Sequence, residues 1–364
     1  MILHRYFAMR FMKTFAGVFG IFFLILVFID LVEQLGRFSK TDAAFADIIS
    51  LTLLNTPQGL YDILPLIMVI STVTLFLGLA RSSELIVNRA AGRSALIALL
   101  SPLVVAFMIG VFAVAAFNPI VAATSREFEA RSNGFKGREQ VLTLGSTGLW
   151  LRQGDADTQT VIRAETANLD GTELQNVTFI TFADTGVPLE RVAAASAILT
   201  AGNWVLQDAK IWPLKDVRTP EAEAIRAARH NIPSTLTADQ IRDSFGTPSS
   251  IPIWDLPAFI TRLQTAGFSA QRHQVWFQME LANPVFLVAM VMIGASFTLR
   301  HQRGGRTGLM VLLAIMLSFG TYFVRNFAQI LGDNGQLPAA LAAWAPPLAA
   351  IGLALGFLLH KEDG

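Results

Sequence analysis

Residues 94–125, SALIALLSPLVVAFMIGVFAVAAFNPIVAATS, contain no charged side chain, and this stretch decides the fold class. A helix crosses a bilayer with about 20 predominantly apolar residues, so the stretch is long enough to span one. Other charge-free runs lie at 14–29, 63–80, 281–299, 307–324 and 334–359. With their ends extended, the runs predict membrane helices at 11–33, 60–80, 95–118, 277–299, 307–330 and 338–359. Asn118-Pro119 is expected to end the third helix, because proline lacks an amide donor and disfavours helix before it.

The charged residues gather in the middle of the chain. Of 364 residues 53% are hydrophobic and 15% charged, with a mean hydropathy of +0.50, whereas an average soluble protein is roughly a quarter charged. Residues 126–272 hold 15 Lys/Arg and 17 Asp/Glu out of 55 charged residues. The residues on either side of 126–272 carry too few charges to form a water-exposed protein surface. This excludes a single soluble globule and indicates a membrane protein with one inserted water-soluble domain.

Lys and Arg are unevenly distributed over the ends and short connections of the expected spans. Ten of them lie on one side: Arg5, Arg10, Lys13, Arg81, Arg89, Arg93, Arg300, Arg303, Arg306 and Lys361. The opposite side has only Arg37 and Lys40. Because connections rich in Lys and Arg stay in the cytoplasm, we expect both termini to be cytoplasmic and the large segment 119–275 to be exported.

The exported segment has the pattern of a β domain. Expected strands lie at 140–151, 159–165, 174–182, 191–200 and 203–214, separated by turns at Gly145, Gly148, Asp170-Gly171, Asp184-Thr185-Gly186 and Gly202-Asn203. Short antiparallel strands at regular spacing favour a sandwich, jellyroll or open barrel. Helices are expected at 236–246 and 253–267, as a return to the membrane. The predicted organisation is therefore spans one to three in 1–118, an all-β jellyroll-like domain in 119–275, and spans four to six in 276–364.

No catalytic constellation is visible. The chain has no cysteine, which excludes a disulfide scaffold, a thiolate metal site and a Cys nucleophile. Its five histidines are isolated, and neither a Gly-x-Ser-x-Gly elbow nor a phosphate-binding loop occurs. We therefore expect no catalytic residue, metal site or cofactor in this chain, and its net charge of +1 gives no sign of nucleic-acid binding. Any active work must draw energy from a partner or an ion gradient.

The connection after the second expected span is the most specific segment, with the sequence LARSSELIVNRAAGR at 79–93. It predicts a short helix that begins at Ser82 or Ser83 and stops at Gly92. The apolar residues within it favour a helix seated in the groove of a cytoplasmic partner. An interfacial helix lying on lipid headgroups is the alternative.

This helix and other motifs resemble the LptF/LptG permeases of the ABC transporter that extracts lipopolysaccharide from the bacterial inner membrane. The resemblance covers nearly the whole chain, at 29–35, 65–78, 80–92, 256–267, 284–297 and 343–346. The motif Ile29-Asp30-Leu31-Val32-Glu33-Gln34-Leu35 looks more like the LptG branch than the LptF branch.

The resemblance implies a multi-pass inner-membrane permease with six spans and an exported β-jellyroll. It further implies pairing with an LptF-type homologue, and an LptB-type ATPase dimer that binds the coupling helices and supplies ATP and Mg. An LptC-type protein with one span and a jellyroll would join them. Lipopolysaccharide would enter between the two permeases and pass into a bridge of β-jellyrolls.

Carried over residue by residue, the ATPase-coupling role falls on the helix at 81–92. Its members are Arg81, Ser83, Glu84, Leu85, Ile86, Arg89 and Gly92. Glu84 would offer a carboxylate to the ATPase groove, while Leu85 and Ile86 would supply apolar anchorage.

Substrate contacts are expected at the outer end of the first span. Asp30, Glu33, Arg37 and Lys40 are spaced to share one helical face, and Arg37 and Lys40 would bind phosphate, together with Arg325. The alternative is a cluster in which Glu33 pairs with Arg37. Some relatives have a basic residue where Asp30 stands and another near Glu280, so phosphate binding does not carry over to these two acidic positions.

Apolar residues of the expected strands are candidates for a lipid conduit in the exported domain: Leu142, Leu144, Leu149, Ile162, Phe179, Ile180 and Phe182. The alternative is that they form an ordinary core. Three other classes stay open at this point: an ion-coupled secondary transporter, a membrane-anchored envelope enzyme and a structural envelope-assembly scaffold. The ionisable residues lie near the ends of the spans, which counts against the first.

Overall fold

The computed structural model describes residues 2–39, 44–82, 84, 95–136, 142–145, 148–154, 158–168, 171–200, 202–215, 217, 219–234, 236, 237, 241, 247–265, 269–299 and 307–362. These residues belong to two compact units. The helical unit comprises 1–136, 249–256 and 271–364, and the sheet unit comprises 137–248 and 257–270. Most of the helix expected at 236–246 lies outside the described residues.

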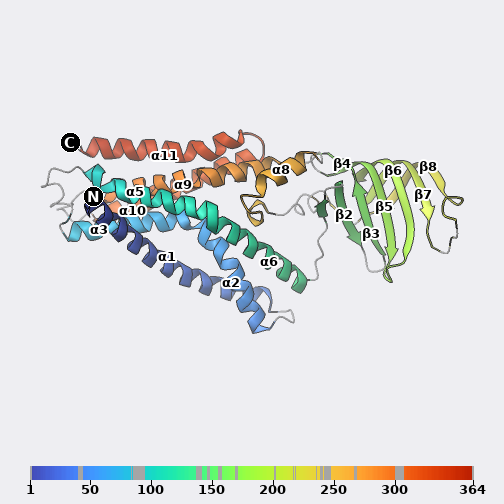
Figure 1. Ribbon diagram of the computed structural model, residues 1–364, viewed down its shortest axis with the longest axis horizontal. Coiled ribbons are helices and arrows are strands. Elements are labelled where there is room, and N and C mark those ends of the chain that lie inside the picture. The colour runs from blue at the N-terminus through green and yellow to red at the C-terminus, as the bar shows by residue number, and fades with distance from the viewer. Residues whose placement is uncertain are drawn as a thin grey trace. The chain divides into compact units, whose positions relative to one another are not determined.

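Among the residues that the structure describes, six helices of the helical unit are long and apolar enough to cross a membrane, as expected. They are α1 (Ile2–Arg37), α3 (Leu64–Arg81), α5 (Ala95–Phe112) continued through η1 (Ala113–Phe117) and α6 (Asn118–Lys136), α9 (Gln271–Thr298), α10 (Thr307–Asp333) and α11 (Ala339–Glu362). Figure 1 shows α1 in dark blue, α9 in orange and α11 in red as long continuous helices. Because α1 extends well beyond a single apolar run, the helix ends differ from those expected while the count is confirmed.

The connection after the first span contains a further helix, α2 (Phe45–Asp62), which was not predicted. Its buried side chains include Leu51, Thr52 and Leu60, and it packs against α1 and α6. The chain turns at Ile63, and Pro65 stands at the start of α3, where its missing amide leaves no helical hydrogen bond unmade. Packing against α1 and α6 therefore orders as a helix a segment that is not apolar enough to be predicted as a membrane-spanning helix.

The third span does not end at Asn118-Pro119, contrary to expectation. The five residues before Asn118 form the π-helical turn η1, and the Asn118 amide bonds the Ala113 carbonyl five residues back. Pro119 has no amide with which to reach the Ala115 carbonyl, and the Trp254 indole donates to that carbonyl instead, at 3.1 Å. The side-chain oxygen of Asn118 also accepts the Ile253 amide at 3.0 Å. A distant segment thus satisfies the backbone group that the proline leaves open, and the helix continues.

The centre of the helical unit is α9. In its most apolar window 78% of the residues are buried, against 11% for α1 and for α10, and it packs against α3, α5, α10 and α11. Small residues allow this: a Cβ added at Gly110 of α5 would lie 2.5 Å from Pro284 Cα, and one at Gly294 would lie 3.1 Å from Thr72 Cβ. The peripheral helices α1 and α10 leave large apolar side chains exposed, among them Phe28 and Phe323.

The sheet unit contains one antiparallel sheet whose strands pair in chain order, apart from a short side strand. The strands are β1 (Leu142–Gly145), β2 (Gly148–Gly154), β3 (Thr158–Ala164), β4 (Thr166–Ala167), β5 (Glu173–Ala183), β6 (Pro188–Thr200), β7 (Asn203–Pro213) and β8 (Ile225–Pro233). The strands from β2 to β8 are labelled in Figure 1, and among the described residues the short strand β4 pairs with β5. The expected antiparallel β structure is confirmed.

Three of the predicted turns depend on glycine. Gly171, Gly186 and Gly202 all have positive φ, between 70° and 81°, which is unfavourable for residues with a Cβ. The last strand, β8, was not predicted. Its exposed sequence IRAARHNIP is a polar edge without alternation, and it is ordered by pairing with β7.

One face of the sheet forms a continuous core. Trp204 is completely buried and meets Phe179 edge-to-face, with ring centroids 6.1 Å apart. Helix α8 (Leu256–Thr265) contributes Leu263 and, half-buried, Phe259 to this core. The helix expected at 253–267 therefore exists, and its apolar side covers the core of the sheet unit.

Candidate functional site

The segment after α3 brings together three side chains from two distant parts of the chain. Glu84 accepts hydrogen bonds from Arg10 Nη1 at 2.5 Å, from the Tyr6 hydroxyl at 2.9 Å and from Ser82 Oγ at 2.7 Å. Arg10 lies over the Tyr6 ring, 5.7 Å from its centroid, and also donates to the Tyr6 hydroxyl. The carboxylate expected to face a partner is thus bound by residues of its own chain. Sequence reasoning did not assign a site role to Tyr6 or Arg10, since they lie more than 70 positions away in the chain.

Two effects oppose each other at this carboxylate. Partial burial works to raise the pKa of Glu84, and the hydrogen bonds from Arg10, Ser82 and Tyr6 outweigh it, so the pKa lies below its ordinary value. Glu84 is therefore ionised at neutral pH. Of the other coupling candidates, Arg81 is exposed at the end of α3. The remaining ones, Ser83, Leu85, Ile86, Arg89 and Gly92, lie outside the described residues.

The four charged residues expected to share one face at the outer end of α1 lie in different environments. Arg37 donates to Glu33 at 2.8 Å, with side chains that are 40% and 55% exposed. The Glu33–Arg37 pair, which the sequence analysis left open as the alternative to phosphate binding, is therefore present. Asp30 is instead buried and accepts hydrogen bonds from Asn55 of α2 at 2.7 Å and from Gln34 at 3.1 Å. Asp30 thus ties α1 to α2. Lys40 lies outside the described residues.

A buried polar cluster surrounds Glu280 of α9. Only 2% of Glu280 is exposed, and the Tyr61 hydroxyl donates to its carboxylate. Asn283 donates to the Tyr61 oxygen at 3.5 Å. Arg325 of α10 interacts electrostatically with Glu280, and its guanidinium lies over the Phe286 ring at 4.8 Å from the centroid. Like Asp30, Glu280 is an internal acceptor that binds a side chain of another helix.

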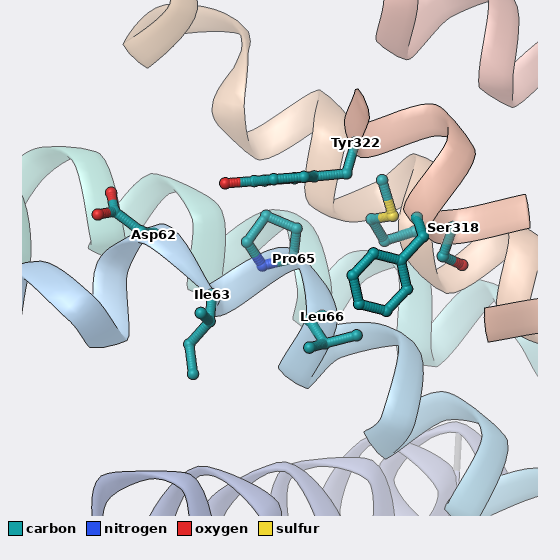
Figure 2. A pocket seen from close by; sticks show the side chains of 8 residues that line it. Asp62, Ile63, Pro65, Leu66, Ser318 and Tyr322 are labelled. Atoms are coloured by element: carbon teal, nitrogen blue, oxygen red, sulfur yellow. The ribbon is translucent and has the colours of Figure 1, made fainter. Parts of the chain in front are cut away.

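An apolar pocket lies beside this cluster, where α3, α9 and α10 meet. Its volume is about 100 Å³, and it is lined by Asp62, Ile63, Pro65, Leu66, Met290, Ser318, Phe319 and Tyr322. In Figure 2 the hydroxyl end of the Tyr322 ring points to the side on which Asp62 lies, and Ser318 lies on the other side of the view. Arg325 follows Tyr322 by three residues on α10, so it projects from the same side of the helix. No local sequence pattern predicts this pocket, because it forms only where separate helices pack.

The conduit candidates do not share one face of the sheet. Ile162 and Phe179 are buried in the core of the sheet unit, as is Leu149. Ile180 and Phe182 are half-buried, and alternation along β5 points both of them to the face opposite Phe179. Leu142 and Leu144 lie on β1, and nothing is described of their side chains.

These features define a multi-pass membrane protein that carries a β-sheet unit between its third and fourth spanning helices. The sequence pattern of the family described as lipopolysaccharide export system permease LptF/LptG matches residues 5–360. The chain belongs to this family. It is similar to the lipopolysaccharide export system permease protein LptG of Haemophilus influenzae, with 22% identity over an aligned length of 352 residues, and the match covers 92% of each chain.

Proposed function

We propose that this chain is the permease subunit of an ABC transporter that extracts lipopolysaccharide from the inner membrane and passes it to a bridge of periplasmic β-jellyrolls. Membership of the lipopolysaccharide export permease family over residues 5–360 is the observation that carries the proposal. The six membrane-length helices and the inserted antiparallel sheet support it, since they supply a membrane part and a water-exposed part in one chain.

The orientation rests on charge. The ten-to-two excess of Lys and Arg puts both termini and the segment after α3 in the cytoplasm. The sheet unit between the third and fourth spans is then periplasmic, and it takes the role of the β-jellyroll domain that receives the lipid. Arg37 and Arg325 both lie toward the outer ends of their helices in this orientation, and the pocket is lined by the outer end of α3 and the middle of α10.

The substrate is a phosphorylated, multiply acylated lipid, so its binding region needs apolar walls below a cationic rim. The pocket between α3 and α10 offers an apolar space of about 100 Å³ for part of an acyl chain. Arg325, stacked on Phe286, offers a planar guanidinium that suits phosphate. Arg37 and Lys40 complete the rim, whereas Asp30 and Glu33 serve as partners within the chain.

The sheet unit would receive the lipid next. Ile180 and Phe182, which lie outside the tight core around Trp204, are the better conduit candidates. Leu142 and Leu144 stand opposite Leu151 and Leu149 in the register of β1 and β2, and therefore on the face that carries the core. Ile162 and Phe179 are committed to the core.

The energy comes from partner chains. An LptB-type ATPase dimer, with ATP and Mg, would bind the coupling segment at 81–92 through Leu85 and Ile86, with Arg81, Ser83, Arg89 and Gly92 shaping the helix. An LptF-type permease would pair with this chain, and an LptC-type protein would join the exporter.

Affinity purification of the full chain from detergent-solubilised inner membranes tests this proposal. We expect an ABC ATPase subunit and a second six-span homologue to copurify, with lipopolysaccharide bound. Replacing Leu85 and Ile86 together with Asp should remove the ATPase and leave the homologue in place. A preparation that contains neither partner would contradict the proposal.

A further inference from the structure

Asp62 puts a carboxylate at the edge of the pocket between α3, α9 and α10. This residue is exposed, and its Oδ1 accepts a hydrogen bond from Gln58 Nε2 at 3.0 Å. The side-chain oxygen of Gln58 in turn accepts a hydrogen bond from Ser125 Oγ at 3.5 Å. Neutral groups therefore hold the carboxylate in place without neutralising its charge. In the orientation proposed above, Asp62 lies beside the outer end of α3, at the depth of the lipid headgroups.

The acidic groups near the pocket outnumber the basic group beside them. Arg325 interacts electrostatically with both Asp62 and Glu280, and the two carboxylates also act on each other. Two acids thus share one guanidinium near the outer ends of the spans. Because an ionisable group at membrane depth is costly unless it is paired, this arrangement favours the binding of one more positive charge.

Most of the other side chains that line the pocket are apolar, and they reach the surface of the helical unit. They include Ile63, Leu66, Met290 and Phe319, and Phe319 is 52% exposed. The helix that carries Phe319, α10, is one of the two least buried spans. A lipid of the surrounding bilayer therefore reaches the pocket without leaving the membrane. A carboxylate beside an apolar space fits an amphiphile with a cationic head.

A lipid ammonium group fits this site better than a metal ion. Ca²⁺ and Mg²⁺ take about six or more oxygen ligands, and among the described residues no group of three or more acidic, histidine or cysteine side chains is placed to hold a metal ion. A primary ammonium group needs only one carboxylate and has three N–H donors. The apolar wall has no use for a bare ion, whereas it accommodates an acyl chain.

We propose that the pocket holds a phosphatidylethanolamine molecule of the surrounding bilayer, with its ammonium group bound to Asp62 and part of one acyl chain in the apolar space. The phosphate of this lipid lies two carbons from the ammonium group, where Arg325 attracts it. The inference goes beyond the proposed function, which concerns the transported lipid. Because that function places part of a substrate acyl chain in the same pocket, the two lipids compete for it.

Photocrosslinking of the full chain tests the inference. The chain, together with the partners that copurify with it, is reconstituted in vesicles of equal parts phosphatidylethanolamine and phosphatidylglycerol with the same acyl chains. Phe319 is replaced by the photoreactive azidophenylalanine, and the lipid adducts are counted by mass spectrometry. We expect adducts of phosphatidylethanolamine to exceed those of phosphatidylglycerol about tenfold, the preference that one charged hydrogen bond supplies.

Three matched changes locate the preference. Asp62→Asn removes the charge and keeps the shape, so the ratio of adducts should fall to about one. Asp47→Asn makes the same change on the same helix, where asparagine still accepts the Ala44 amide, and should leave the ratio unchanged. Azidophenylalanine in place of Phe323, which is 73% exposed and does not line the pocket, should report the bulk lipid with a ratio of about one.

The outcomes are distinct. A ratio of about one at position 319 overturns the inference, and so does a preference that survives Asp62→Asn. A preference for phosphatidylglycerol that requires Mg²⁺ also overturns it, because Asp62 would then hold a metal ion that bridges to the lipid phosphate. Lipopolysaccharide added to the vesicles should lower the yield of phosphatidylethanolamine adducts. An unchanged yield would remove the pocket from the substrate path of the proposed function and would leave the phosphatidylethanolamine site intact.

Discussion

The close approach of α5 to α9 gives the sharpest structural prediction, through Gly110→Ala. The new Cβ would lie 2.5 Å from Pro284 Cα, 3.0 Å from its Cβ and 3.3 Å from its nitrogen. Carbon atoms in contact normally stay about 3.5–4.0 Å apart, so the two helices must separate by about 1 Å. The clash is with backbone at the centre of the helical unit, and no side-chain rotation relieves it.

The cost follows from two opposing effects. Overpacking a tight core costs about 1–3 kcal/mol, while alanine in place of glycine stabilises a helix by up to about 1 kcal/mol. We expect a net loss of about 1–2 kcal/mol, and each kcal/mol lowers the melting temperature of a unit this size by about 2–4 °C. Gly352→Ala in α11 is the matched control, because no atom lies within 4 Å of its added Cβ.

Thermal unfolding of both variants in the same detergent measures this difference. Gly110→Ala should melt several degrees below the wild type, and Gly352→Ala at or slightly above it. If Gly110→Ala melts with the control, the packing of α5 on α9 described here is wrong.

Three other predictions concern separate parts of the chain. Tyr61→Phe removes a hydrogen-bond donor to buried Glu280 and should lower the free energy of unfolding by about 1–3 kcal/mol. The control Tyr322→Phe should change the free energy of unfolding by less than about 0.5 kcal/mol. Equal losses of both variants in thermal melts would argue against the buried cluster around Glu280. Trp204→Ala should lower the free energy of unfolding of the sheet unit by about 3–5 kcal/mol, which proteolysis detects as faster cleavage. The control Trp150→Ala, at a position that is 36% exposed, should lower it much less. Similar cleavage rates for the two variants would count against the described core. Because the pKa of Glu84 lies below its ordinary value of 4.5, the contribution of its ion pair is fully present above that pH and disappears as the pH falls through the lowered pKa. A fluorescent label on Met9→Cys, in this cysteine-free chain, should report a transition below pH 4.5 that Glu84→Gln abolishes; a transition above pH 5 would refute the assignment.

The spans and most strands were predictable because each depends on a local pattern. Charge-free runs of membrane length predict the six helices, and alternation with glycine turns predicts most of the sheet up to β7. One expected strand, at 140–151, is instead the hairpin of β1 and β2. The continuation through Pro119 could not be predicted, because it requires Trp254 to bond the Ala115 carbonyl from 139 residues away. Helix α2 and strand β8 depend in the same way on neighbours that order them.

The candidate site was predictable only where its residues are close in sequence. The spacing of Glu33 and Arg37 predicts their ion pair, and the motif around Glu84 identifies the coupling segment. The partners of Glu84, Asp30 and Glu280 are Arg10, Asn55 and Tyr61, and each comes from another helix. Acidic residues that are bound internally therefore have the same sequence pattern as acidic residues that face a ligand.

The central claim is that this chain moves lipopolysaccharide with energy from a separate ATPase. Proteoliposomes that contain the chain, its ATPase and its second permease, with lipopolysaccharide in the bilayer and a soluble β-jellyroll acceptor outside, test it most directly. We predict that lipopolysaccharide crosslinks to the acceptor only when ATP and Mg are present, while phospholipid does not. ATP hydrolysis without any transfer of lipopolysaccharide, or equal transfer of phospholipid, would contradict the claim.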